Sequence, residues 1–337
     1  MHRLAACLVA AAVATAAPAA TETIVEHLYT NTTVEDQRIR SYWTPERIET
    51  LHDDPLLPAS FPLPFEERPY GNEFGDTQSI VRTVGRILST VFLTNGTAQD
   101  GSCTGTLLNS RNGAVVVTAG HCIFGAPSGV NGTWLTNLLF IPGFRDGSGV
   151  ANFTVNRGYI SSHWEASPGF EGEIHDRAFL VLNPDPASNS DAESVLGTGR
   201  RIKFTDAAPE QPYKRRWLFG YPRSDGAGAQ DHLRYGTPAF TGRRLATCNG
   251  TPGLFGPDPS MLQVACYMSG GASGGPIMED FDANTGKGSI VAVNTFTGSI
   301  YDEYKQKMVL AMVGTPVTNS FSKKLFSLAE SIIPVLV

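Results

Sequence analysis

The hydrophobic pattern of the chain consists mainly of short β-rich runs that are separated by turn residues. From residue 83 onward, apolar and β-branched side chains gather in short segments, with Gly, Pro, Asn and Asp between them. The runs lie at 83–93, 105–110, 113–120, 137–144, 153–160, 177–184, 215–222, 262–268 and 289–296. Many short strands joined by such turns predict an all-β protein, built as an antiparallel barrel or sandwich.

The last part of the chain changes from this pattern to a helical one. Within residues 320–333, the apolar positions recur at helical spacing. They are Leu325, Phe326, Leu328, Ala329, Ile332 and Ile333. This spacing predicts a C-terminal amphipathic helix that packs on the body. A lipid-anchor signal is the alternative, but the apolar tail is short and Glu330 interrupts it.

Residues 1–19 have the pattern of a secretory signal peptide. His2 and Arg3 give a basic start, an apolar stretch begins at Leu4, and small residues follow it. The apolar run is shorter than the roughly 20 residues that a membrane-spanning helix needs. We therefore expect a secreted, extracellular protein without a membrane anchor.

Residues 20–78 differ from both neighbouring parts. They include the proline-rich stretch PLLPASFPLPFEERP and show no sustained strand alternation. Such a segment between a signal and a folded body predicts a propeptide or flexible leader, and a disordered arm is the alternative. Residues 79–337 then form the folded domain.

Composition and charge narrow the classes of partner. Only 17% of the 337 residues are charged, and the formal net charge is −6. An acidic, lightly charged chain argues against a nucleic-acid partner.

The cysteine count agrees with export. Removal of the signal also removes Cys7, which leaves Cys103, Cys122, Cys248 and Cys266. An even number in an exported protein predicts two disulfides, and four cysteines allow three pairings. Proximity in the sequence favours Cys103–Cys122 and Cys248–Cys266.

Five Asn-x-Ser/Thr sequons predict a glycoprotein with these turns at the surface. They begin at Asn31, Asn95, Asn131, Asn152 and Asn249.

Two segments contain candidate catalytic chemistry. Ser273 stands in CYMSGGASGGPI among residues with almost no side chains, which marks either an ordinary turn or a nucleophile that needs bare backbone beside it. His121 stands in VVVTAGHCIFG, where a β run ends in small residues that leave an imidazole edge open to a cleft. A serine nucleophile needs a base within hydrogen-bond reach, and His121 can supply it.

These segments resemble the chymotrypsin superfamily of serine peptidases. Thr-Ala-Gly-His-Cys matches the surroundings of its catalytic base, and Gly-Ala-Ser-Gly-Gly-Pro matches its nucleophile motif. The order TVGRIL, SCTGTLLNS, VVTAGHC, FIPGFRDG, FGYP, SGGASGGP and VNTF is similar to the secreted microbial branch that includes glutamyl endopeptidases and trypsin-like relatives. The resemblance extends from about Thr83 to Phe326. It implies a chymotrypsin-like double antiparallel β-barrel over residues 79–337, completed by the C-terminal helix.

The resemblance also implies roles for individual residues. His121 is the base and Ser273 the nucleophile, with Cys103 as the half-cystine that pairs with Cys122. The amides of Gly271 and Ser273 form the oxyanion hole, because glycine permits the unusual φ values of such a turn.

The third member of the triad should be a carboxylate between His121 and Ser273, directly before an apolar strand. Asp176 fits, since residues 177–182 read RAFLVL. Asp146, Asp185 and Asp191 are the rivals, but they stand in turn or loop sequences. The neighbours Glu173 and His175 are interpreted as bystanders. The order His, Asp, Ser is that of the chymotrypsin superfamily.

The chain departs from the family at its activation and specificity positions. Ala272 replaces the aspartate that pairs with the new N-terminus in vertebrate digestive relatives, so that pairing cannot form. Arg68 in the leader and Arg82 just after it are candidate cleavage sites.

The specificity pocket has no usual counter-charge. Tyr267 stands where trypsin-like relatives carry aspartate, and residues 290–296 lack the histidine of glutamyl-specific relatives. We expect Val293, Asn294 and Thr295 to bind substrate with Tyr267, and an uncharged P1 residue.

The predicted function is a secreted serine endopeptidase, a zymogen and monomer that acts on protein or peptide substrates without a cofactor. An inactive homologue that serves as a binding or effector protein is the alternative, and an esterase of another fold is a weaker one. A metal site is not expected, because His121, His163, His175 and His232 show no ligand spacing.

Overall fold

The structure is a computed structural model that describes residues 21–52, 71–75, 79–126, 132–210, 213–223, 241–256, 258, 260–303 and 305–337. The predicted signal peptide, Arg68, Asn131 and His232 lie outside these residues.

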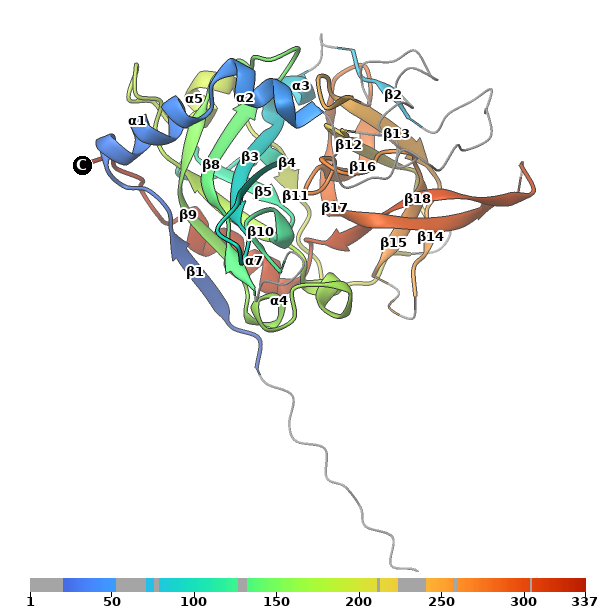
Figure 1. Cartoon of the computed structure of the whole chain (residues 1–337). Coiled ribbons are helices and arrows are strands. Elements are labelled where there is room, and N and C mark those ends of the chain that lie inside the picture. Colours follow the sequence, from blue (N-terminus) through green and yellow to red (C-terminus); the bar gives the residue numbers. More distant parts are fainter. Residues whose placement is uncertain are drawn as a thin grey trace, which may run out of the picture.

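The first sheet closes into an antiparallel barrel (Figure 1). Its strands are β3 (Val84–Phe92), β4 (Ala98–Leu107), β5 (Val115–Thr118), β8 (Thr136–Pro142), β9 (Phe153–Ser161) and β10 (Ala178–Leu182). They run in the order β9-β10-β5-β4-β3-β8, and β8 pairs back with β9. Every residue of β5 and β10 is buried, as expected for strands with packed neighbours on both faces.

The second sheet is also antiparallel along its main path. It contains β2 (Asn72–Glu73), β12 (Arg216–Gly220), β13 (Ala246–Gly250), β14 (Gly253–Leu254), β15 (Leu262–Ala265), β16 (Pro276–Asp282), β17 (Lys287–Asp302) and β18 (Lys307–Pro316). Their order is β14-β15-β18-β17-β16-β12-β13-β2, and β11 (Arg201–Ile202) pairs in parallel with β17. The far ends of β17 and β18 extend as a long hairpin away from the body (Figure 1). A small separate ladder joins β6 (Phe124–Gly125) to β7 (Thr133–Trp134).

Helices are short and lie around the sheets. They are α1 (Thr33–Tyr42), α2 (Pro45–Glu49), α3 (Ser79–Thr83), α4 (Ser162–Ala166), α5 (Ala192–Leu196) and α7 (Ser320–Ala329), with 3₁₀ turns η1 (Thr50–His52), η2 (Gly120–Cys122) and η3 (Phe170–His175). None of the described helices combines the length and the apolar character that a membrane span requires.

The predicted C-terminal helix is confirmed as α7, but it ends at Ala329, so Ile332 and Ile333 of the predicted apolar face lie beyond it, and Ile333 is 81% exposed. Asn319 caps its first turn by accepting a hydrogen bond from the Ser322 amide at 2.8 Å. Leu325 and Ala329 are fully buried, and the Phe326 ring lies 6.2 Å from that of Phe179 in β10. The apolar face therefore packs on the first barrel, and the predicted fold class is correct.

The described part of the predicted leader is folded onto the first barrel. β1 (Ile24–Leu28) pairs antiparallel with β9, and α1 and α2 cross the barrel in Figure 1. Ile39, Trp43 and Leu51 belong to the main hydrophobic core. A flexible extension would not pack in this way, whereas removal of the segment as a propeptide stays a prediction.

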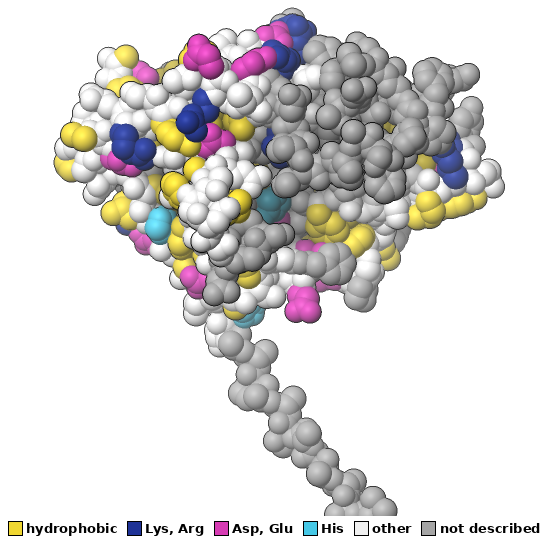
Figure 2. Space-filling view, viewed as in Figure 1, with side chains coloured by type: hydrophobic (Ala, Val, Ile, Leu, Met, Phe, Trp, Pro, Cys, Tyr) yellow, Lys and Arg dark blue, Asp and Glu magenta, His cyan; other side chains and the backbone are white. Residues whose placement is uncertain are grey.

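Charged side chains on the described part of the face in Figure 2 are scattered, and acidic and basic groups lie close to one another. Several are paired across the N-terminal segment, for example Arg40 with Asp36 at 2.7 Å and Arg47 with Asp100 at 2.6 Å.

Candidate active site

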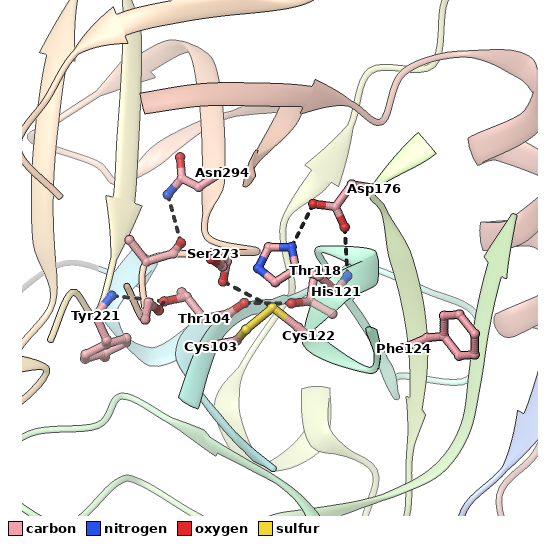
Figure 3. The surroundings of a disulfide bond; sticks show 12 residues. Cys103, Thr104, Thr118, His121, Cys122, Phe124, Asp176, Tyr221, Ser273 and Asn294 are labelled. Carbon is pink, nitrogen blue, oxygen red and sulfur yellow. Dashed lines mark hydrogen bonds and ion pairs between the residues drawn. A yellow bond between two sulfur atoms is a disulfide. The ribbon is translucent and has the colours of Figure 1, made fainter. Parts of the chain in front are cut away.

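His121 lies in the 3₁₀ turn η2, directly after β5 of the first barrel. The disulfide between Cys103 and Cys122 ties this turn to β4 (Figure 3). The side chain of His121 is 33% exposed, and it lines the surface of a cleft.

Asp176 lies between η3 and β10, and both of its carboxylate oxygens contact His121. Its Oδ1 accepts a hydrogen bond from the backbone N–H of His121 at 2.7 Å, and its Oδ2 lies 2.7 Å from the ring Nδ1. The carboxylate is buried, with 1% of its side chain exposed. Both oxygens therefore fix the position and the tautomer of one histidine.

The three rival aspartates have local structural roles instead. Asp146 adopts a left-handed conformation and pairs with Arg244. Asp185 accepts hydrogen bonds from Ser188, and Asp191 caps α5.

Two opposing effects act on the His121 imidazole. Burial lowers its pKa, but the charge of Asp176 and the hydrogen bond to it outweigh burial. The pKa is therefore raised from its ordinary value of 6.5. The imidazole therefore holds its proton more tightly than a free histidine does.

Ser273 follows a glycine-rich turn before β16 of the second sheet. Figure 3 shows the His121 ring between Ser273 on one side and Asp176 on the other. Among the described hydrogen bonds, none joins the Ser273 hydroxyl to His121, although such bonds are often long before substrate binds. Serine, imidazole and carboxylate thus come from two sheets to one region.

Glycine is required in the Ser273 turn because the backbone is both left-handed and crowded. Gly271 has φ +95° and Gly274 has φ +80°. A Cβ atom on Gly274 would lie 2.0 Å from Thr118 Oγ1, and one on Gly271 would lie 2.5 Å from the Tyr221 carbonyl oxygen. A larger residue at 274 would therefore push the turn away from the first barrel, and one at 271 would push it away from the segment after β12.

Within the described residues, the backbone N–H groups of Gly271 and Ser273 donate to no protein acceptor. The carbonyls of the same two residues are held instead. Gly271 accepts from Thr104 Oγ1 at 2.8 Å, and Ser273 accepts from the Thr104 amide at 2.7 Å. The turn is therefore held through the carbonyls of Gly271 and Ser273, while the N–H groups of these residues remain free to donate to an anion.

A cleft of about 1080 Å³ opens beside His121 and Asp176. Of the predicted substrate-binding residues, Thr295 lines it, whereas Tyr267, Val293 and Asn294 are buried and do not belong to its lining. Asn294 instead donates through Nδ2 to the carbonyls of Phe219 and Ala272, at 2.9 and 3.1 Å. Its side chain therefore braces the turn that carries Ser273.

Sequence reasoning predicted His121, Asp176 and Thr295 in the cleft but missed most of its lining, including Trp164 and Glu173. Trp164 is buried, and its indole N–H donates to the Phe124 carbonyl at 2.9 Å. Glu173 was interpreted as a bystander, but it lines the cleft. Its place three residues before Asp176 gave no sequence signal that it faces the cleft, because that depends on segments distant in the sequence.

Ala272 is fully buried and belongs to the smaller of the two hydrophobic clusters. Its methyl group packs against Gly220, where an added Cβ would lie 2.8 Å away. The position before Ser273 is therefore filled by apolar packing.

The described chain holds a second cluster of ligating side chains near β1. Glu22, His163 and His175 have potential ligand atoms within 4.8 Å of one another. Burial raises the pKa of Glu22, but hydrogen bonds from His175 and Ser161 and the charge of Arg177 outweigh it and lower that pKa to about 2. The carboxylate is thus already used by protein donors. The other such group, His121 with Cys103 and Cys122, contains the disulfide.

The remaining sequence-predicted features are placed as follows. Cys248 and Cys266 form the second disulfide, between β13 and the segment after β15. Asn31, Asn95 and Asn152 are exposed, whereas Asn249 is half-buried and accepts a hydrogen bond from Arg215. Glycosylation at the sequons stays a prediction.

A closed antiparallel barrel, a second antiparallel sheet and a C-terminal helix define the chymotrypsin-like fold. The chain is similar to solved structures of that fold. A thermostable serine protease from an extremophilic microorganism shares 22% identity at a TM-score of 0.57, covering 75% of this chain and 99% of its own. The protease Anisep from Arthrobacter nicotinovorans also shares 22% identity at a TM-score of 0.57, covering 78% of this chain and 100% of its own.

A Glu endopeptidase shares 14% identity at a TM-score of 0.52, covering 80% of this chain and 100% of its own. No protein-family profile matches the chain. No curated protein matches it either.

Proposed function

We propose that the protein is a secreted serine endopeptidase that uses His121, Asp176 and Ser273 as a catalytic triad. The observation that carries the proposal is the pair of hydrogen bonds that Asp176 accepts from His121, beside a cleft and near Ser273 (Figure 3). The solved structures of the same fold, which are proteases by their descriptions, support it.

The proposed mechanism assigns one task to each group. His121 takes the Ser273 proton as the hydroxyl attacks the scissile carbonyl, and Asp176 stabilises the imidazolium. The amides of Gly271 and Ser273 bind the oxyanion. His121 then protonates the leaving amine, and water releases the acyl group from Ser273 in a second addition. This chemistry requires no cofactor.

The proposal includes processing and export. The signal peptide of residues 1–19 is removed, and exposed sequons receive glycans. Residues 20–78 contain a propeptide cleavage site, and the mature enzyme is a monomer. Two disulfides are consistent with an oxidising compartment. Tyr267, Val293 and Asn294 shape the specificity region from behind, while Thr295 faces substrate in the cleft.

Labelling with a fluorophosphonate tests the proposal. The wild-type protein should be modified at Ser273, as located by mass spectrometry, and should cleave unfolded casein. S273A should lose both properties while its circular dichroism and melting temperature are unchanged. A folded wild-type protein that is neither labelled nor active would refute the enzyme and favour the binding or effector alternative.

A further inference from the structure

Glu173 is an acidic side chain of the cleft for which the mechanism above has no use. Among the described lining residues, the acids are Glu173 and Asp176, His121 is the titratable base, and neither Lys nor Arg is present. Both oxygens of Asp176 are occupied by His121. The remaining carboxylate charge of the cleft therefore belongs to Glu173.

Among the residues that the structure describes, the Glu173 carboxylate has no hydrogen-bond or ion-pair partner. Its Oε2 atom is buried and accepts no hydrogen bond. Burial raises the pKa of the carboxyl group, and the nearby charge of Asp176 raises it further. A carboxylate that is partly removed from water and unpaired is unstable relative to one that meets a cation.

The backbone around Glu173 is held from two sides. Its carbonyl accepts from Thr315 Oγ1 at 2.6 Å and from the Asp176 amide at 3.1 Å. Thr315 Oγ1 lies 2.6 Å from Thr295 Oγ1, which lines the same cleft. Glu173 is thus fixed relative to the triad acid and to the substrate-facing edge of β17.

We propose that Glu173 is a specificity-determining residue that binds a cationic side chain, lysine or arginine, of the peptide substrate in the cleft beside His121. The proposal rests on the proposed endopeptidase function and names the substrate class for this site. A guanidinium or ammonium group in the cleft would give the Glu173 carboxylate a charge-assisted hydrogen-bond donor. The walls of Trp164, Phe255 and Phe296 would bury the aliphatic stem of such a side chain.

Profiling of cleavage sites tests the inference. Wild-type protein, E173Q and E171Q are incubated with the same library of peptides, and all products are sequenced. E171Q is the matched control, because Glu171 lies in η3, is exposed and does not line the cleft.

We expect wild type and E171Q to favour Lys or Arg at one substrate position. E173Q should lose that preference by about 10- to 100-fold in kcat/KM and retain its rate on peptides that are uncharged there. Cleavage without a basic preference, or an equal preference in E173Q, would overturn the proposal. A uniform loss of rate in E173Q on all peptides would also overturn it, because that result identifies a structural or electrostatic role.

A binding experiment separates this inference from the proposed function. Hexalysine carries a cation at every residue, so one lysine can reach Glu173 however the peptide is aligned in the cleft. It is titrated into S273A, S273A/E173Q and S273A/E171Q by isothermal titration calorimetry. The E173Q change should weaken binding about 10-fold or more relative to the E171Q change, which has the same effect on net charge. Equal binding refutes the cation site, whether or not the wild-type protein cleaves peptides.

Discussion

At the scale of single residues, the environment of His121 decides how it can work. Its backbone N–H and its ring Nδ1 both face Asp176, so the ring cannot turn without breaking the contact between the two residues. The ring Nε2 is thereby the nitrogen that remains for a substrate or for Ser273. Because the charge of Asp176 outweighs burial, the imidazole binds its proton more tightly than a free histidine does.

The pH dependence of the rate should report this balance. The base must be neutral, so kcat/KM should rise with pH through the folded-state pKa of His121, which lies above 6.5. D176N removes the raising charge while burial remains, so the midpoint should move to lower pH. The maximal rate should fall by about 10³- to 10⁴-fold, because the wrong tautomer is then favoured.

Rates on a peptide substrate from about pH 5 to 9 measure both effects. An acid limb below 6.5 in the wild-type protein, or an unchanged midpoint in D176N, would contradict this account of His121.

At the scale of elements, the two disulfides should have different consequences. They close loops of similar length, with sequence separations of 19 and 18, so each should contribute about 3 kcal/mol to the free energy of unfolding. The Cys103–Cys122 bond also fixes the turn of His121, whereas Cys248–Cys266 lies in the second sheet. C103A/C122A should therefore lose kcat as well as stability.

Urea unfolding and kcat of the two double variants check this difference. C248A/C266A serves as the control, because it should be destabilised to a similar extent while its kcat at 25 °C is nearly unchanged. Equal losses of kcat in both variants would show that the disulfide beside His121 has no special effect on the site.

The N-terminal elements supply polar partners to the barrel that nothing else in the described chain supplies. Asp36 in α1 is buried, accepts from Thr154 Oγ1 of β9 at 2.5 Å and pairs with Arg40. Its replacement leaves the Thr154 hydroxyl and the Arg40 guanidinium with one acceptor fewer. D36A should lower the free energy of unfolding by about 2–4 kcal/mol.

Glu46 provides the control for that variant, since it is exposed in the first turn of α2. E46A should change stability by less than about 1 kcal/mol. A melting temperature of D36A equal to that of E46A would mean that α1 does not stabilise the body, and would favour its removal as a propeptide.

The sequence predicts an element well when the residues that determine it are adjacent in the chain, and poorly when the element depends on contacts with distant segments. The strand runs before Ser273, the capped helix after Asn319 and the motifs of His121 and Ser273 are each contained in a few adjacent residues, and the sequence predicts them. β1 was missed because it is only IVEHL, half-exposed, and is stabilised by pairing with β9, which is distant in the sequence. The exposure of Glu173 to the cleft, and the burial of Tyr267, likewise depend on which distant segments meet.

At the scale of the whole molecule, the site exists only where the two sheets meet. His121 and Asp176 belong to the first barrel, whereas Ser273 belongs to the second sheet. Thr104 of β4 joins them, because its amide donates to the Ser273 carbonyl and its hydroxyl donates to the Gly271 carbonyl. The same hydroxyl accepts from the Tyr221 amide at 2.9 Å. Thr104 thus holds the Ser273 turn in position against the half of the molecule that carries His121.

T104V should therefore damage stability and activity together. The variant keeps the shape of the side chain but leaves the Gly271 carbonyl and the Tyr221 amide without a partner, at a cost of about 2–4 kcal/mol. The Gly271 amide would then be less well aimed, so kcat/KM should fall about 10-fold or more. T106V is the matched control, because Thr106 is a buried threonine of the same strand whose hydroxyl has no hydrogen-bond partner in the described part of the chain. Removing that hydroxyl should leave stability unchanged or raise it, and should leave kcat/KM unchanged. If T104V and T106V gave the same unfolding curve in urea and the same kcat/KM, the contact through Thr104 would not be what aligns the two halves of the site.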